Sequence, residues 1–96
     1  MKFEEYRDVF RTIISGDIES FERQFDVWQL LIGMRNDIGL EDPEYRALAL
    51  KISKYVHELA AYQAHLTGNA KFDQLYWKFL LLEAQCKDVD SYFLYL

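Results

Sequence analysis

The sequence is poor in the residues that cross-link or punctuate a small protein. Its 96 residues include one cysteine, one proline and four glycines, so an intramolecular disulfide is excluded and turns are few. No apolar run approaches the roughly eighteen residues that a membrane-spanning helix needs, and residues 1–5 lack the apolar core of a secretory signal. We therefore expect a soluble, cytoplasmic protein in which residues 1–96 form a single domain.

Positive charge is also scarce, because 11 basic residues stand against 16 acidic ones and the net charge is −5. Direct nucleic-acid binding draws on clustered Lys and Arg, so this balance argues against it. The imbalance lies in residues 1–48, which hold eleven acidic and six basic side chains, whereas residues 49–96 hold five of each. This acidic half is either a solvated face or a face that meets a basic partner.

Apolar residues are abundant, at 51% of the chain, and they recur at helical spacing. No stretch has the strict alternation of a half-buried strand. The stretch from residue 69 to residue 96 keeps one seam along a single helix through alternating steps of three and four. The seam residues are Phe72, Leu75, Phe79, Leu82, Cys86, Val89, Phe93 and Leu96. On this seam the Cys86 thiol is expected to be buried and inert.

The first half of the chain predicts a short helix followed by a longer one. The short helix ends near Ser15, where Gly16 can take the left-handed conformation and Asp17 can cap the next helix. The longer helix fades between residues 37 and 39, and Gly33 inside it is expected to let another backbone approach closely. The seam of the short helix is Phe3, Tyr6, Phe10 and Ile13. That of the longer one is Ile18, Phe21, Phe25, Trp28 and Ile32, widened by Val27, Leu31 and Met34.

The segment from residue 39 to residue 43 is the clearest break in the chain. Asp42 is expected to be the N-cap of a third helix and Pro43 its first residue. A second long seam follows, made of Tyr45, Leu48, Ile52, Tyr55, Leu59, Tyr62 and Leu66. Gly68 then closes this helix and Asn69 caps the last one, so the two helices must be antiparallel. The sequence predicts an all-α antiparallel bundle of four helices, one short and three long, with helices three and four as a long hairpin.

Catalytic and metal-binding patterns do not appear on these helices. His57 begins the run His-Glu-Leu-Ala-Ala, but the zinc-protease motif needs a second histidine where Ala61 stands. Neither His57 nor His65 follows an acidic residue at the spacing of helical di-iron proteins. Glu83 and Lys87 have the spacing of a surface ion pair. We therefore assign no catalytic residue, no cofactor and no metal ion, and we expect that the chain is not an enzyme.

The last helix carries more apolar side chains than one seam requires. Trp and Tyr are favoured at protein interfaces, because they bury a large area and keep a polar group. The candidate interface residues are Tyr76, Trp77, Leu80, Leu81, Tyr92 and Tyr95.

The succession of helices and caps resembles one known group. A short helix, a longer one, a third helix that begins with Asp42, Pro43, Glu44, Tyr45 and Arg46, and a last helix that begins after Gly68 and Asn69 are similar to the small helical YlbF/YmcA group of bacterial cytoplasmic proteins. The resemblance implies a non-enzymatic protein that acts in complexes, including regulation of RNA processing through a ribonuclease partner. No functional motif of the group matches, so no functional residue is carried over.

The expected function is a non-enzymatic protein-interaction module. It would be an oligomeric helical bundle, a homodimer in the simplest case, that acts as a regulator or adaptor on a protein partner. Two alternatives stay open. One is an acidic inhibitor that mimics nucleic-acid charge, and the other is a small metal- or ligand-binding bundle that uses carboxylates with His57 or His65.

Overall fold

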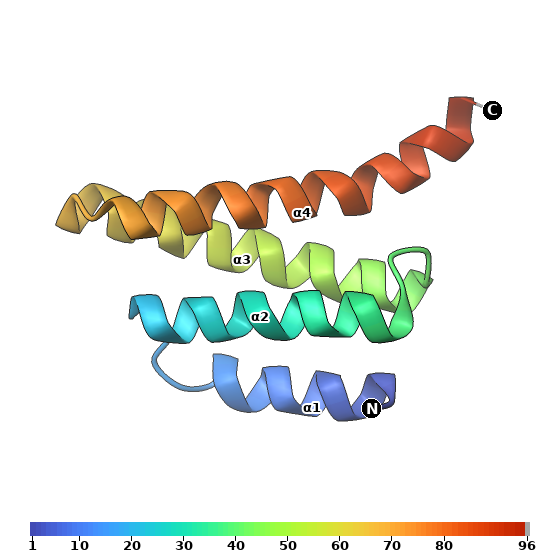
Figure 1. Cartoon of the computed structure of the whole chain (residues 1–96), viewed down its shortest axis with the longest axis horizontal. Helices are drawn as coiled ribbons and strands as arrows, with labels where there is room; N and C mark the ends of the chain where they lie inside the picture. Colours follow the sequence, from blue (N-terminus) through green and yellow to red (C-terminus); the bar gives the residue numbers. More distant parts are fainter. Residues whose placement is uncertain (96) are drawn as a thin grey trace.

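The computed structural model describes the backbone of residues 1–95 and the side chains of residues 1–87. Within that range the chain forms helices and no strands, and consecutive helices run in opposite directions (Figure 1). The helices are α1 (Phe3–Ile14), α2 (Phe21–Ile38), α3 (Pro43–Thr67) and α4 (Ala70–Tyr95). The predicted all-α bundle of one short and three long helices is confirmed.

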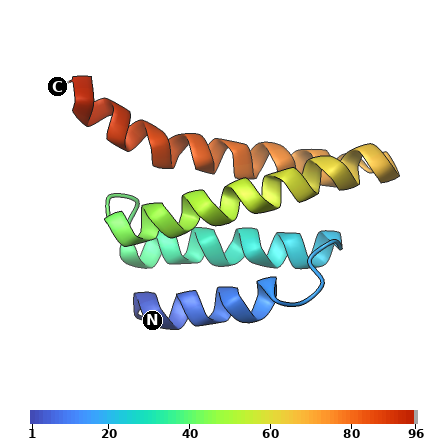
Figure 2. The same ribbon diagram turned by 180° about the vertical axis from the view of Figure 1, so that it is seen from behind.

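The two longest helices form the structural base of the bundle. The contact between α3 and α4 is the most extensive in the molecule, which confirms the predicted hairpin. Helix α2 packs on both of them, and α1 packs on α2 and, less extensively, on α3. The turn of the hairpin extends past the start of α2 and the end of α1 in both side views (Figures 1 and 2). Helix α1 therefore does not cover the part of α3 nearest the hairpin turn.

The boundaries of α3 and the start of α4 follow the predicted capping chemistry. Oδ1 of Asp42 accepts a hydrogen bond from the backbone N–H of Tyr45 at 3.0 Å, and Pro43 occupies the first helical turn. Gly68 has a φ of 68° and donates its N–H to the carbonyl oxygen of Ala64 at 2.9 Å. Oδ1 of Asn69 accepts a hydrogen bond from the backbone N–H of Lys71, in the first turn of α4. These three caps confirm the predicted hairpin turn.

The connection between α1 and α2 differs from the prediction. Ser20, not Asp17, caps α2 by accepting from the N–H of Arg23 at 3.3 Å, and Asp17 accepts instead from the N–H of Glu19 within the connection. Ile18 is the physical reason, because its side chain is 4% exposed and belongs to the core. Within residues 1–95 only Gly39 and Gly68 have a positive φ, so the left-handed conformation expected at residue 16 is wrong.

The core confirms the predicted seam of α4 as far as residue 86. Its members on the described side chains are buried: Phe72, Leu75, Phe79, Leu82 and Cys86. The predicted burial of the Cys86 thiol is likewise confirmed. The remaining predicted seam positions, Val89, Phe93 and Leu96, lie outside the described side chains.

Helix α2 is buried through the residues expected only to widen its seam, and not through the centre of the seam. Its buried residues are Gln24, Val27, Leu31 and Met34. Ile18, which precedes the helix, is buried as predicted. The predicted seam residues within the helix lie on its flank and are partly exposed: Phe21, Phe25, Trp28 and Ile32. On that flank the rings of Trp28 and Phe79 meet edge to face, with centroids 5.5 Å apart. A Cβ added to Gly33 would meet nothing within 4 Å, so the expected close approach of another backbone is also wrong.

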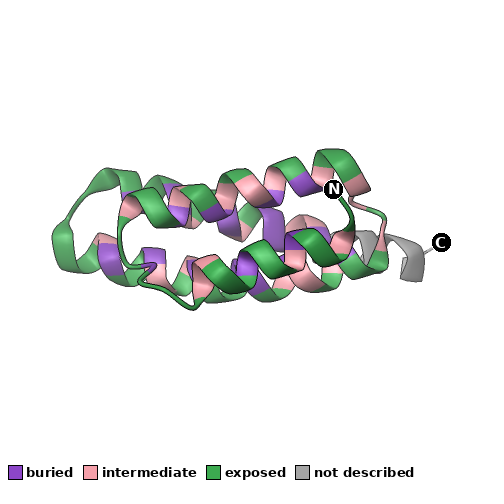
Figure 3. Ribbon diagram, turned by 90° about the horizontal axis from the view of Figure 1, so that it is seen from below, coloured by how far each residue is buried: buried purple, intermediate pink, exposed green. Residues whose placement is uncertain are grey.

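The seam of α3 is the largest departure from the prediction. The buried row is Tyr45, Ala49, Ile52, Ser53, Val56, Ala60 and Gln63. Beyond residue 52 this row is displaced by one residue, or about 100°, from the predicted seam. Tyr55, Tyr62 and Leu66 are 48%, 59% and 63% exposed. The small side chains of the buried row allow neighbouring helices to approach closely. Figure 3 shows how buried, intermediate and exposed positions are distributed along the helices.

Among the described residues, no helix offers a stretch both apolar enough and long enough to cross a lipid bilayer.

Candidate functional site

The first candidate surface lies on the outer side of α4. Trp77 and Leu81 stand one turn apart and are 60% and 62% exposed. We call these two residues the α4 patch. Large apolar side chains that remain this exposed on a packed helix are candidates for contact with another molecule.

The other predicted interface residues do not share this exposure. Tyr76 and Leu80 are half-buried. The Tyr76 ring meets the His57 ring edge to face, with centroids 5.7 Å apart, and contacts the Trp77 ring at 5.4 Å. Tyr76 therefore lies between the α4 patch and α3. Tyr92 and Tyr95 lie outside the described side chains.

A buried polar contact joins α3 to α4 beside Tyr76. Nδ1 of His57 lies 2.7 Å from Oε2 of Glu83, whose side chain is 7% exposed, and Nζ of Lys87 lies 3.0 Å from Oε1 of the same carboxylate. The His57 contact is a close approach that is not aligned as a hydrogen bond, since Nδ1 and Oε2 are both without a hydrogen-bond partner. The predicted surface pair of Glu83 and Lys87 is thus a real contact, but its carboxylate is buried.

Sequence reasoning missed the partnership between His57 and Glu83, because the two residues belong to different helices and no local pattern connects them. The arrangement joins the two helices of the hairpin, and two ionisable groups, His57 and Lys87, flank the Glu83 carboxylate. Within residues 1–87, no three His, Cys, Asp or Glu side chains come close enough to hold a metal ion.

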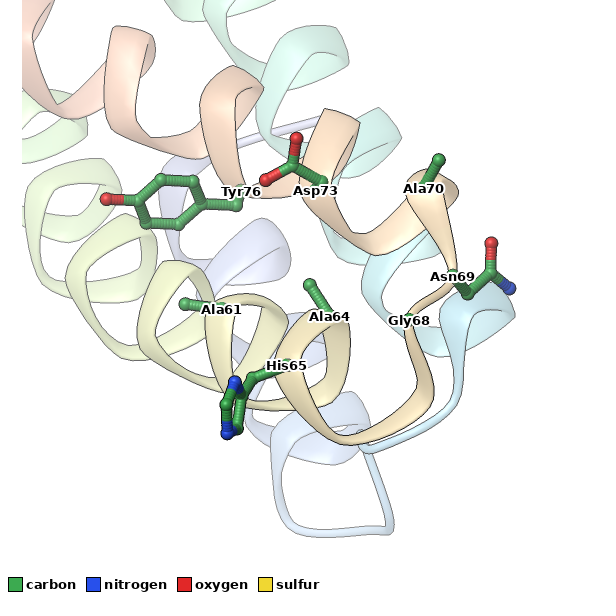
Figure 4. A pocket seen from close by; sticks show the side chains of 8 residues that line it. All are labelled: Ala61, Ala64, His65, Gly68, Asn69, Ala70, Asp73 and Tyr76. Atoms are coloured by element: carbon green, nitrogen blue, oxygen red, sulfur yellow. The ribbon is translucent and has the colours of Figure 1, made fainter.

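A shallow cleft lies at the turn of the hairpin and has a volume of about 340 Å³. Small residues of both helices line much of it, and Figure 4 shows its polar side chains. The imidazole of His65 and the carboxylate of Asp73 point away from each other in this view. The cleft therefore does not bring these two groups together as an acid–base pair.

The second candidate surface is a row on α3. It consists of Tyr55, Leu59, Tyr62 and Leu66, which we call the α3 stripe. Residues 65–71, which include the end of the stripe, are all exposed. The residues of the stripe follow heptad spacing. They belong to the predicted seam of α3, but they lie on the surface of the helix and not in the core.

A groove between α1 and α3 continues from this stripe. Its volume is about 500 Å³. Phe10 and Ile14 of α1 and Leu48, Ile52 and Tyr55 of α3 provide its apolar walls. Its remaining lining residues are Arg7, Arg11, Ser15 and Lys51. We call this feature the α1–α3 groove.

No protein-family model, no curated protein and no solved structure matches this chain. The resemblance to the YlbF/YmcA group stays a prediction from the sequence.

Proposed function

We propose that this chain is a non-enzymatic protein-interaction module that acts as a regulator or adaptor by packing its helices against those of other chains. One observation carries the proposal: five large apolar side chains on the two longest helices are about half exposed or more. They are Tyr55, Tyr62, Leu66, Trp77 and Leu81. Scattered single exposed apolar residues are normal in a monomer, but rows at helical spacing are typical of surfaces that another helix covers.

The α4 patch is the proposed site of self-association. Trp77 and Leu81 are four residues apart, so an antiparallel contact between two copies of α4 places Trp77 of one copy against Leu81 of the other. Such a twofold contact repeats the same pair of interactions on both sides of the axis. Trp is also among the residues that contribute most to binding at the centre of interfaces.

Sedimentation velocity over about a hundredfold range of protein concentration tests this self-association, because a dimer dissociates on dilution. We expect a dimer at high concentration. The double substitution Trp77→Ala with Leu81→Ala should weaken the dimer at least about tenfold, while circular dichroism stays unchanged because both side chains are exposed. The matched control is Tyr62→Ala on α3, which should leave the dimer intact.

A wild-type protein that stays monomeric at the highest concentration would refute self-association through the α4 patch. A dimer that survives the double substitution would also exclude this patch.

A further inference from the structure

We propose that the α1–α3 groove and the α3 stripe together bind one amphipathic helix of a partner protein, whose apolar side is bordered by acidic residues. This inference rests on the proposed role as an interaction module, but it concerns a different surface from the α4 patch and specifies the chemistry of the partner.

The length of the apolar surface favours a helix as the occupant. The floor of the groove and the α3 stripe form one continuous row on α3, made of Leu48, Ile52, Tyr55, Leu59, Tyr62 and Leu66. The steps of four and three residues are those of a coiled-coil seam. Ile52 is 4% exposed, so the part of this row that a partner can contact most fully runs from Tyr55 to Leu66. At 1.5 Å per residue this part is about 17 Å long, which matches three turns of a second helix.

The fold leaves this row partly uncovered. Helix α1 has only 12 residues and ends at Ile14, so it lies over the part of the row nearest Leu48. The hairpin end extends past α1, as Figures 1 and 2 show. Exposure along the row is accordingly large at Tyr62 and Leu66, at 59% and 63%.

The charge of the groove favours an acidic occupant. Three cationic side chains line it, Arg7, Arg11 and Lys51, and no carboxylate does. This local excess of positive charge is notable because the whole chain carries a net charge of −5. A partner helix with carboxylates beside its apolar side would complement these cations and would be oriented by them.

These cations are only weakly paired within the chain. Asp8 lies outside the groove lining, and its Oδ1 is 3.9 Å from both Nε of Arg7 and Nη1 of Arg11. That distance is too long for a hydrogen bond, and Nε of Arg7 is buried without a hydrogen-bond partner. Arg7 and Arg11 stand one turn apart on α1, a spacing at which two glutamates one turn apart on a facing helix can meet them.

Fluorescence anisotropy with two synthetic peptides tests the proposal. Both peptides are helical with leucine at heptad positions a and d; one carries glutamate at positions e and g, and the other carries lysine there. We expect saturable binding of the glutamate peptide, at least about tenfold tighter than that of the lysine peptide. The double substitution Arg11→Glu with Lys51→Glu should reverse this preference, and both side chains are exposed.

Further variants separate the apolar contribution and the two surfaces. Leu66→Ser should weaken the binding of both peptides, because it removes apolar area from the row without changing the charge of the protein. Trp77→Ala with Leu81→Ala should leave peptide binding unchanged. A monomeric wild-type protein would refute the α4 dimer and would leave this peptide result standing, so the two proposals fail separately.

Three results would overturn the inference. The first is equal affinity for the two peptides or no binding of either. The second is an affinity for the glutamate peptide that the charge reversal does not lower. The third is a wild-type dimer that the charge reversal abolishes, since a second copy of this chain would then fill the groove.

Discussion

Glu83 and His57 approach within 2.7 Å at a site where the carboxylate is almost fully buried, so a polar contact fixes the register of α3 against α4. A buried carboxylate that loses one of its partners keeps the cost of its desolvation. Among the described side chains, Lys87 is the second charged neighbour of this carboxylate, and its side chain is half exposed.

The substitution His57→Ala removes the imidazole beside this carboxylate together with its ring contact to Tyr76, and it should lower the free energy of unfolding by about 1 kcal/mol. Urea unfolding followed by circular dichroism measures the loss. The control is His65→Ala, an exposed histidine of the same helix, which should change stability by less than about 0.5 kcal/mol. Equal losses in the two variants would mean that the contact with Glu83 does not contribute to stability.

Gly33 offers an opportunity to stabilise the fold. It lies within α2, is exposed, and has open space where a Cβ would be. Gly33→Ala should raise the free energy of unfolding by about 0.5–1 kcal/mol, because alanine has the higher helix propensity. Gly68→Ala should have the opposite effect on stability. Gly68 has a φ of 68°, and alanine in this conformation should lower the free energy of unfolding by about 1 kcal/mol. Thermal unfolding of both variants checks the two signs together.

Asp37 links stability to pH. Its Oδ2 accepts from the Tyr6 hydroxyl at 2.8 Å and from the Met1 amino group at 3.1 Å. The Tyr6 hydroxyl, and next the Met1 amino group, hold the pKa of Asp37 below its usual value of 3.8. Because the pKa of Asp37 is lower in the folded state, its carboxylate contributes fully to stability above pH 3.8. That contribution is lost as the pH falls through the folded-state pKa.

Wild-type protein should accordingly be more stable than Asp37→Asn near neutral pH, and the difference should shrink on acidification below pH 3.8. Denaturant midpoints measured across the acidic range follow this difference. In a Tyr6→Phe background the difference should be smaller at every pH. A difference that grows in acid would contradict the assignment.

Tyr45 provides a probe of the contact between α2 and α3. Its side chain is fully buried and its hydroxyl donates to the carbonyl oxygen of Leu31 at 3.0 Å. Burial raises the pKa of Tyr45 far above its usual range, so the folded chain should keep this phenol protonated in alkaline solution. Tyr45→Phe should cost about 1 kcal/mol of stability, whereas Tyr62→Phe, at a 59% exposed position, should cost almost nothing. Urea unfolding of the two variants makes the comparison.

The elements of the fold were predictable where local chemistry decides them. The caps at Asp42 and Gly68 depend on neighbouring residues, and the structure confirms both. The α4 seam was predictable as far as residue 86 because its apolar steps of three and four residues are unbroken. The cap of α2 was not predictable in the same way. Ser20 caps this helix and Asp17 does not, because burial of Ile18 in the core, a tertiary effect, delays the start of the helix.

The seam of α3 was not predictable from its apolar pattern. Two rows have helical spacing, and the one with large side chains, such as Tyr55 and Tyr62, gives the stronger signal. The core instead uses the row with Ala49 and Ala60, because the fit to α2 and α4 depends on the shapes of all three helices. The same limit applies to the candidate interface, since only the packing against α3 distinguishes half-buried Tyr76 from exposed Trp77.

The short turn at Gly68 and Asn69 also has a consequence for the order of folding. Because the most extensive contact of the molecule joins helices that are adjacent in sequence, closing it costs little chain entropy. We expect the hairpin of α3 and α4 to form early and α2 and α1 to dock afterwards. Opening in the native state should follow the reverse order, so the amide protons of α1 should exchange with solvent before those of α3.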